Sequence, residues 1–148
     1  MNFDRTFTLS EAQALLPQLE GLLQSALRAH RQVEELDQQL QTLISHILLA
    51  GGVQIDPIQT SRLKAERARG AQRFEDAVGE ISASGVQLKD LEQGLLDFPC
   101  LLNGKMVLLC WKQGEAAIEH WHGTQEGFAH RKPLDPSMYR GEPPARVN

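Results

Sequence analysis

The sequence predicts an α+β protein, in which a long antiparallel α-helical hairpin, coiled-coil-like in its pattern, precedes a small three-stranded antiparallel β meander. The hairpin is predicted by apolar residues that recur every three or four positions from Leu19 to Ile47, which is the spacing of one helix face. The meander is predicted by Asn103-Gly104 between two apolar segments, the strongest short-range signal of a β-hairpin. Helices followed by strands, rather than alternating with them, indicate the α+β class.

The composition changes along the chain, and these changes define the expected domain organisation. The N-terminal half is rich in Leu, Gln, Glu, Ala and Arg, both tryptophans and both cysteines follow it, and residues 129–148 hold four prolines. We expect a single domain over residues 1–134, with the helical hairpin at residues 7–85 and the meander at residues 86–128. Residues 135–148 are expected to form an extended, proline-containing tail.

Length and composition are close to those of an ordinary soluble globular protein. The 148 residues, of which 23% are charged and 41% hydrophobic, match an average single domain. No apolar run approaches the roughly 20 residues of a membrane helix, and no basic and then apolar leader opens the chain. We therefore expect a cytoplasmic protein without a membrane partner. The net charge of −4 argues against a nucleic-acid partner.

The first helix has a predicted start, an interruption and an end. Thr8 and Glu11 have the spacing of a capping box, in which each side chain bonds the other residue's backbone N–H. Pro17 removes one backbone hydrogen bond, so we expect a kink there. Gly51-Gly52 would end the helix. The apolar face between them comprises Leu19, Leu22, Ala26, Ala29, Val33, Leu36, Leu40, Leu43 and Ile47.

The second helix is predicted to begin at Asp56-Pro57, since Asp is a favoured N-cap and Pro suits the first helical position. Gly85 is the predicted end. Two helices alone would leave part of each apolar stripe exposed, so we expect a homodimer through the helical hairpin. Residues 11–41 are mainly acidic and residues 62–73 mainly basic, which would give the paired helices complementary flanks. The first functional hypothesis is therefore a non-enzymatic homodimeric assembly or adaptor protein.

Three segments are predicted as strands: Leu95–Leu102, Lys105–Lys112 and Ala117–His122. The two-residue turn at Asn103-Gly104 pairs the first two strands so that Asp97 lies opposite Cys110.

A group of potential metal ligands falls within the meander. Its members are Asp90, Glu92, Asp97, Cys110, His120 and His122. Carboxylate, thiolate and imidazole groups are ligands for divalent transition metals. Asp90, Asp97 and His122 are the main candidates, with Glu92 and His120 as further candidates.

The register of the third strand decides whether these groups meet. His120 and His122 project from the same face of a strand. A two-residue turn at Gly114-Glu115 would pair Leu109 with His120 and turn both imidazoles away from the acids. A slip by one residue would pair Cys110 with His120 and bring them onto one face. The sequence leaves both registers open, and the histidines could equally be partly exposed strand residues.

A catalytic triad of Cys110, His122 and Asp97 is a further alternative, but it requires an accessible, activated thiolate. Cys110 lies within an apolar strand, which favours a small core residue. The chain also has no phosphate-binding glycine loop, nucleophile elbow or zinc-protease motif. These observations leave enzymatic activity open and favour a non-enzymatic role.

Several motifs resemble a known family. They are Phe7-Thr8-Leu9-x-Glu11-Ala12-x-x-Leu15-Leu16-Pro17, Val86-x-Leu88-Lys89-Asp90-Leu91-Glu92-x-Gly94-Leu95-x-Asp97-Phe98-Pro99, Leu109-Cys110-Trp111-Lys112-x-Gly114-Glu115, Trp121-His122 and Gly127-Phe128-x-x-Arg131-x-Pro133-Leu134. Over residues 7–134 the chain resembles the family called domain of unknown function 2203. The resemblance implies a small bacterial cytosolic protein and no established activity.

The resemblance also bears on individual residues. Trp111, Glu115 and Arg131 lie within the family's motifs and are candidate ligand-binding residues. His120 is not part of the pattern, which favours His122 acting with the acids. Many relatives have an Asp after the Trp-His pair, where this chain has Gly123.

The alternative functional hypothesis is therefore a protein that binds a divalent transition metal or a small ligand around Asp90, Asp97 and His122. It extends to a hydrolase, in which Glu92 or Glu115 would act as the base.

Overall fold

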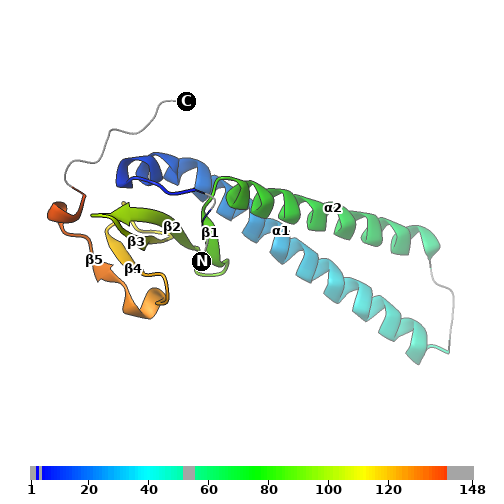
Figure 1. Ribbon diagram of the computed structural model, residues 1–148. Coiled ribbons are helices and arrows are strands. Elements are labelled where there is room, and N and C mark those ends of the chain that lie inside the picture. Colours follow the sequence, from blue (N-terminus) through cyan, green and yellow to red (C-terminus); the bar gives the residue numbers. More distant parts are fainter. Residues whose placement is uncertain (1–2, 4, 52–55, 140–148) are drawn as a thin grey trace. The chain divides into compact units, whose positions relative to one another are not determined.

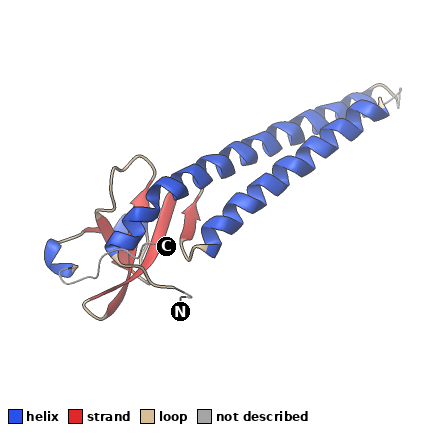
Figure 2. Cartoon of the chain, turned by 90° about the horizontal axis from the view of Figure 1, so that it is seen from above, coloured by secondary structure: helices blue, strands red, loops and turns tan. Residues whose placement is uncertain are grey.

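The computed structural model (Figure 1) describes residues 3, 5–51 and 56–139. This part of the chain contains two long helices and a five-stranded sheet (Figures 1 and 2). The elements are α1 (Leu9–Leu49), α2 (Pro57–Ala83), β1 (Gln87–Asp90), β2 (Leu95–Leu102), β3 (Lys105–Lys112), β4 (His120–Gly123), η1 (Phe128–His130), β5 (Lys132–Pro133) and η2 (Pro136–Met138).

The sheet is antiparallel throughout, and its strands lie in the order β1-β2-β3-β4-β5. The α+β class is confirmed, but the predicted number of three strands is wrong. The sequence prediction missed β1 because its four residues are mostly polar, and it missed β5 because that strand has two residues and one is Pro133. None of the described helices combines the length and apolarity needed to cross a lipid bilayer.

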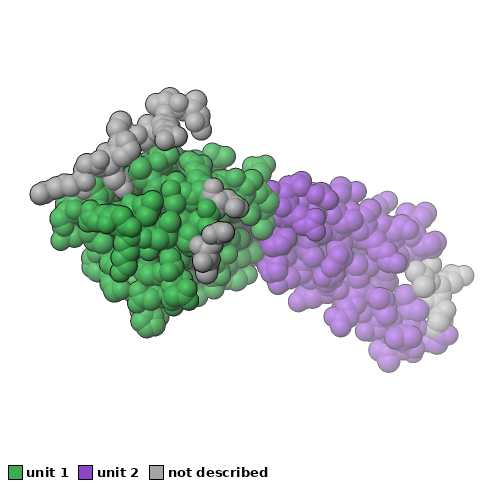
Figure 3. Space-filling view, in the orientation of Figure 1, with its two compact units in different colours: residues 1–23, 78–148 green, residues 24–77 purple. Residues whose placement is uncertain are grey.

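The chain forms two compact units (Figure 3). Residues 1–23 and 78–148 form unit 1, and residues 24–77 form unit 2. Both long helices contribute to both units.

Unit 2 consists of antiparallel helical segments that touch through small side chains. Ala26, Ala29, Gly70 and Ala77 are buried, and a Cβ atom at Gly70 would lie only 3.1 Å from Cγ2 of Val33. Small residues at these positions let the two helices approach closely.

Polar contacts also join these helices. Arg67 forms an ion pair with Asp37, and Nη2 of Arg73 donates to Oε1 of Gln32 at 2.6 Å. The ion pair joins an acidic residue of α1 to a basic residue of α2, in agreement with the predicted charge complementarity.

The helix ends follow the predicted capping chemistry. The N–H of Thr8 donates to Glu11 Oε1 at 3.2 Å, and the N–H of Glu11 donates to Thr8 Oγ1 at 3.1 Å. Asp56 Oδ1 accepts the Ile58 N–H at 3.0 Å at the start of α2. Gly51 and Gly85 follow the two helices with φ of 73° and 92°, which glycine adopts without steric cost. The predicted end residue Gly52 lies outside the described residues.

Unit 1 is built around a core between one face of the sheet and the ends of the helices that belong to this unit. The core comprises Phe7, Ala12, Leu16, Leu19, Leu23, Ile81, Val86, Leu96, Phe98, Cys100, Leu102, Val107, Leu109, Trp111 and Ile118. The strand residues among them alternate along β2 and β3, so the intervening side chains project from the opposite face of the sheet. We call this opposite face, which carries Asp97 and Cys110, the outer face.

The β2–β3 hairpin has the predicted strands and register. Leu102 pairs with Lys105 and Asp97 pairs with Cys110. Asn103 and Gly104 have φ of 51° and 77°, as the primed hairpin turns require.

The third predicted strand differs from the structure. Instead of Ala117–His122, β4 spans His120–Gly123. The preceding residues form a loop that buries Ile118 in the core, where its N–H donates to Oε1 of Gln13 at 3.0 Å. Cys110 pairs with His120, so the structure adopts the slipped register of the two alternatives.

In the predicted tail over residues 135–148, the described part contains η2. The N–H of Ser137 donates to Asp135 Oδ1 at 3.0 Å at the start of this short helix. Residues 140–148 lie outside the described residues.

Candidate metal centre

Polar side chains form a row across four strands on the outer face of the sheet. The register pairs Gln87 of β1 with Asp97 of β2, Asp97 with Cys110 of β3, and Cys110 with His120 of β4. Residues opposite one another in an antiparallel pair project to the same face. The row extends to His120 because β4 adopts the slipped register, which also places His122 on this face.

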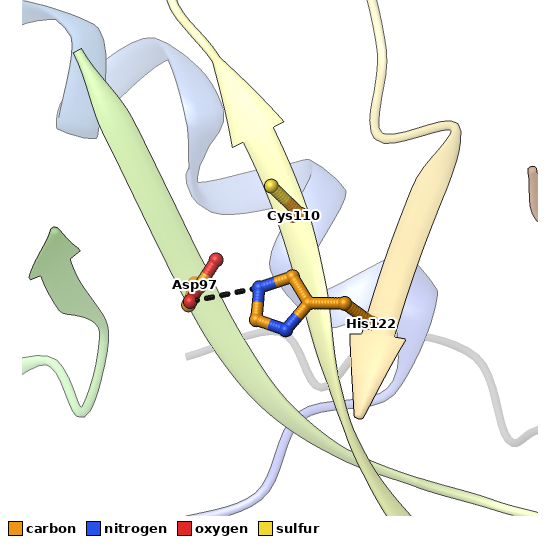
Figure 4. Close-up of side chains that lie close together, drawn as sticks. All are labelled: Asp97, Cys110 and His122. Atoms are coloured by element: carbon orange, nitrogen blue, oxygen red, sulfur yellow. Dashed lines mark hydrogen bonds and ion pairs between the residues drawn. The ribbon is translucent and has the colours of Figure 1, made fainter. Parts of the chain in front are cut away.

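Three side chains of this face converge (Figure 4). One ligand atom each from Asp97, Cys110 and His122 lies within 4.8 Å of the others. Asp97 is 3% exposed, and Cys110 and His122 are 1% exposed. The three residues come from β2, β3 and β4, so the strand pairing holds them together.

Hydrogen bonds fix the orientation of the His122 ring. Its Nδ1 lies 2.9 Å from the carbonyl oxygen of Gly123, which can only accept, so Nδ1 carries a proton. Nε2 lies 3.0 Å from Oδ2 of Asp97. An ionised carboxylate can only accept a hydrogen bond, so Nε2 is the donor in this contact, which we describe as a buried ion pair.

Cys110 is a poor nucleophile in these surroundings. Burial and the negative charge of Asp97 raise the pKa of Cys110 to about 11, although the guanidinium of Arg131 acts in the opposite direction. Because only the thiolate attacks or ligates, the thiol is protonated and inert at neutral pH. This environment argues against the nucleophilic triad. A bound metal cation would reverse the effect, since a coordinating thiol is deprotonated outright.

Glu115 and Arg131 form an ion pair beside this cluster. Nη1 of Arg131 donates to Glu115 Oε1 at 2.9 Å, and the Lys112 N–H donates to the same oxygen at 2.7 Å. Burial raises the pKa of Glu115, but these hydrogen bonds outweigh it and hold the pKa below its usual value. Arg131 also lies over the ring of Phe128, with Cζ 4.3 Å from the ring centroid.

A cavity of about 210 Å³ opens on the cluster. Its lining comprises Lys89, Leu95, Asp97, Cys110, Glu126, Gly127 and Phe128. Two of the three converging side chains therefore face this cavity.

Glu126, which also lines the cavity, already has hydrogen-bond partners. Its Oε1 accepts a hydrogen bond from the Gly123 N–H at 2.8 Å and another from Nζ of Lys132 at 3.0 Å. The ammonium of Lys132 and this N–H lower the pKa of Glu126.

Comparison with known proteins identifies the family. A family model described as "Uncharacterized conserved protein (DUF2203)" matches residues 5–134. The chain belongs to this family. The predicted resemblance is thus confirmed, and the match includes every residue of the cluster and the cavity. No curated protein and no solved structure gives a significant match.

In this DUF2203 protein, only some of the residues predicted as metal ligands come together. Asp97 and His122 meet, and Cys110 joins them. Asp90 instead stabilises the turn after β1, because its Oδ1 accepts a hydrogen bond from the Gln93 N–H at 2.9 Å. Among the described residues, neither Asp90 nor Glu92 belongs to a group of converging metal-ligand atoms.

The remaining candidates divide between the two faces of the sheet. His120 lies beside the cluster, with its Nδ1 3.7 Å from Glu115 Oε2. Glu115 and Arg131 also lie next to the cluster, and their role as ligand-binding residues stays a prediction. Trp111 does not, because it is buried in the core and its indole N–H donates to the Glu115 carbonyl oxygen at 3.0 Å.

Sequence reasoning missed four residues around the cluster and the cavity. They are Gln87, Lys89, Glu126 and Phe128. Lys89 and Phe128 lie within the family motifs, which was the available signal. Nothing in the sequence brings residues 126–128 onto the outer face of the sheet.

Proposed function

We propose that this protein binds a divalent transition metal ion through Asp97, Cys110 and His122. The observation that carries the proposal is the convergence of these three buried ligand atoms within 4.8 Å. Thiolate, imidazole and carboxylate are the ligands that bind zinc and related transition metals in proteins. A hard-cation site would be built from oxygen ligands instead.

The separation between the imidazole and carboxylate ligand atoms suits such an ion. Metal–ligand bonds of about 2.0–2.3 Å at tetrahedral angles place neighbouring ligand atoms about 3.3–3.6 Å apart. The 3.0 Å between Nε2 of His122 and Oδ2 of Asp97 would need to widen by only a few tenths of an ångström. His122 also has the hydrogen bond typical of a metal ligand, since its other nitrogen donates to the backbone carbonyl of Gly123.

Charge supports the same proposal. A divalent cation would replace the proton on His122 Nε2 and the thiol proton of Cys110. Its two positive charges would balance the carboxylate of Asp97 and the thiolate of Cys110, so no net charge is left buried. Because the metal competes with protons, its affinity should fall as the pH falls.

A cobalt titration of the metal-free, tag-free protein tests the proposal. We expect one Co²⁺ per chain and a thiolate-to-cobalt charge-transfer band. Cys110→Ser should abolish the band, and His122→Ala should abolish tight binding. Cys100→Ser and Asp90→Asn are matched controls that should retain both, because Cys100 lies in the core and Asp90 in a turn. Substoichiometric binding, or a band that survives in Cys110→Ser, would overturn the proposal.

We propose in addition that the protein self-associates through its helices, as an assembly protein would. The apolar face of α1 is only half-buried at Leu40, Leu43 and Ile47. Beyond it, Leu48 and Leu49 are 75% and 89% exposed. Single exposed leucines are unremarkable, but a continuous apolar stripe marks an interface. A second copy is the occupant that fits, because the exposed acids of α1 would face the exposed bases of α2.

Sedimentation velocity tests this second proposal. We expect a dimer for the unchanged protein and a monomer for the double variant Leu48→Glu, Leu49→Glu. Leu101→Glu is the control, since Leu101 is also exposed but lies on β2. A monomeric unchanged protein would refute the assembly role and leave the metal proposal unaffected.

A further inference from the structure

We infer that the proposed metal has one coordination position open to the cavity, and that this position takes a small organic carboxylate whose other contacts are with Lys89, Leu95 and Phe128. The inference rests on the proposed metal site and names the class of ligand that the site would hold.

The number of protein ligands is the first step. Zinc-type sites with four protein ligands are closed, whereas sites with three keep a position for water or substrate. Among the described residues, the converging group has three members. Asp97 and Cys110 line the cavity and His122 does not. The open position therefore faces the cavity.

The size of the cavity limits the ligand. Its volume of about 210 Å³ lies below the range of about 300–1,000 Å³ that is typical of sites for drug-sized molecules. It exceeds the space of about 30 Å³ that one water occupies in the liquid. A molecule with a short carbon chain fits, whereas a nucleotide or a peptide does not.

The charges around the cavity favour an anion. A metal ion balanced by Asp97 and Cys110 adds no net charge to its surroundings. Glu126 is already paired with Lys132, and Glu115 is paired with Arg131. Lys89 also lines the cavity, and no ion pair of Lys89 exists among the residues that the structure describes. Lys89 is exposed, and its ammonium is the charge of the cavity lining that is available to pair with an anion.

The apolar part of the lining distinguishes an organic anion from an inorganic one. Leu95 and Phe128 line the cavity together with Lys89. A carboxylate between the metal and Lys89 would place its carbon chain against these two side chains. Inorganic phosphate would supply the charge but leave this apolar surface without a contact.

The test uses the cobalt-loaded, full-length protein and follows the visible cobalt bands during titration with acetate, propanoate, butanoate or inorganic phosphate. We expect each carboxylate to shift the bands, with affinity rising up to about fourfold for each added methylene group that becomes buried. Phosphate should bind more weakly than butanoate. Lys89→Met should weaken butanoate at least tenfold while cobalt remains stoichiometric, and Lys105→Met, at an exposed lysine of the β2–β3 hairpin, should change nothing.

The outcomes separate the two proposals. Stoichiometric cobalt without any band shift overturns the open position and leaves the metal site standing. Equal affinities for acetate and butanoate, or tighter binding of phosphate, overturn the organic ligand. Unchanged butanoate binding in Lys89→Met overturns the role of that lysine. Failure to bind cobalt overturns the metal site and this inference together.

Discussion

Replacing Asp97 by alanine removes one partner of the buried ion pair in the outer face of the sheet. Both partners are almost completely buried, so solvent cannot take over the role of the carboxylate. Removing one member of a buried ion pair costs about 3–5 kcal/mol, because His122 must then either stay charged in the interior or lose its proton and keep a buried nitrogen without a hydrogen-bond partner. We therefore expect Asp97→Ala to lower the free energy of unfolding of the metal-free protein by about 3–5 kcal/mol.

The asparagine variant isolates the electrostatic part of this effect. An amide can donate an N–H to Nε2 of a neutral His122 ring, whose Nδ1 proton still bonds the Gly123 carbonyl. Asp97→Asn should therefore stay within about 1 kcal/mol of the unchanged protein, since it replaces one hydrogen bond by another. The same variant should bind cobalt far more weakly, because a neutral amide replaces an anionic ligand.

Urea unfolding in the presence of a chelator measures both variants, with tryptophan fluorescence and circular dichroism as probes. Asp90→Ala is the control, because it removes a carboxylate of the same kind from a half-buried turn and should cost about 1 kcal/mol. The reasoning fails if Asp97→Ala is no more harmful than Asp90→Ala. It also fails if Asp97→Asn is as harmful as Asp97→Ala.

Three further predictions concern pH, thiol reactivity and a turn. Burial raises the pKa of Glu115, but the Arg131 guanidinium and a backbone N–H lower it below 4.5. The stabilisation by this ion pair should therefore be complete above about pH 4.5 and be lost as the pH falls through the folded-state value. Urea unfolding should show a larger destabilisation by Glu115→Gln at pH 7 than at pH 3, and an equal loss at both would contradict this. The pKa of Cys110 rises from 9.0 to about 11, so its thiolate fraction at pH 8 falls about 100-fold. Cys110 in the metal-free native protein should therefore react with a thiol reagent at least about 100-fold more slowly than in the unfolded chain. Similar rates would refute the raised pKa. Gly94 has a φ of 66°, and an added Cβ would lie 2.5 Å from Gln113 Cβ. Gly94→Ala should therefore cost at least about 2 kcal/mol of stability and lower the melting temperature by about 4–8 °C. An unchanged melting curve would show that the turn relaxes freely.

The β2–β3 hairpin could be predicted to the residue because its turn is specified locally. Asn103 and Gly104 tolerate positive φ, and a two-residue loop then dictates the pairing along both strands. The start of β4 could not be predicted in this way. Its position depends on Ile118 entering the core and on Oε1 of Gln13 in α1 accepting a hydrogen bond from the Ile118 N–H, and both are tertiary contacts.

The candidate site could also be predicted only in part, because some of its features depend on tertiary contacts. Asp97 and His122 could be identified because carboxylates and imidazoles in an apolar meander are few. Asp90 looked equivalent in the sequence, but its carboxylate accepts a local turn hydrogen bond, which the residue type alone does not reveal. Cys110 could be predicted to lie opposite Asp97, but whether His122 joins them depended on the register of β4, which the sequence left open.

The alternation of side chains along the strands has a consequence for the life of the protein in a cell. Each of the three proposed ligand atoms comes from a strand that also packs on the core, as Asp97 does between Leu96 and Phe98, so only the folded sheet would assemble the proposed metal site. An ion present at about 1,000 times its dissociation constant would then add about 4 kcal/mol to the free energy of unfolding, a large share of the 5–15 kcal/mol typical of a domain. Starvation for that ion would increase the unfolded fraction, expose more chains to proteases and lower the abundance of the protein without any change in its synthesis.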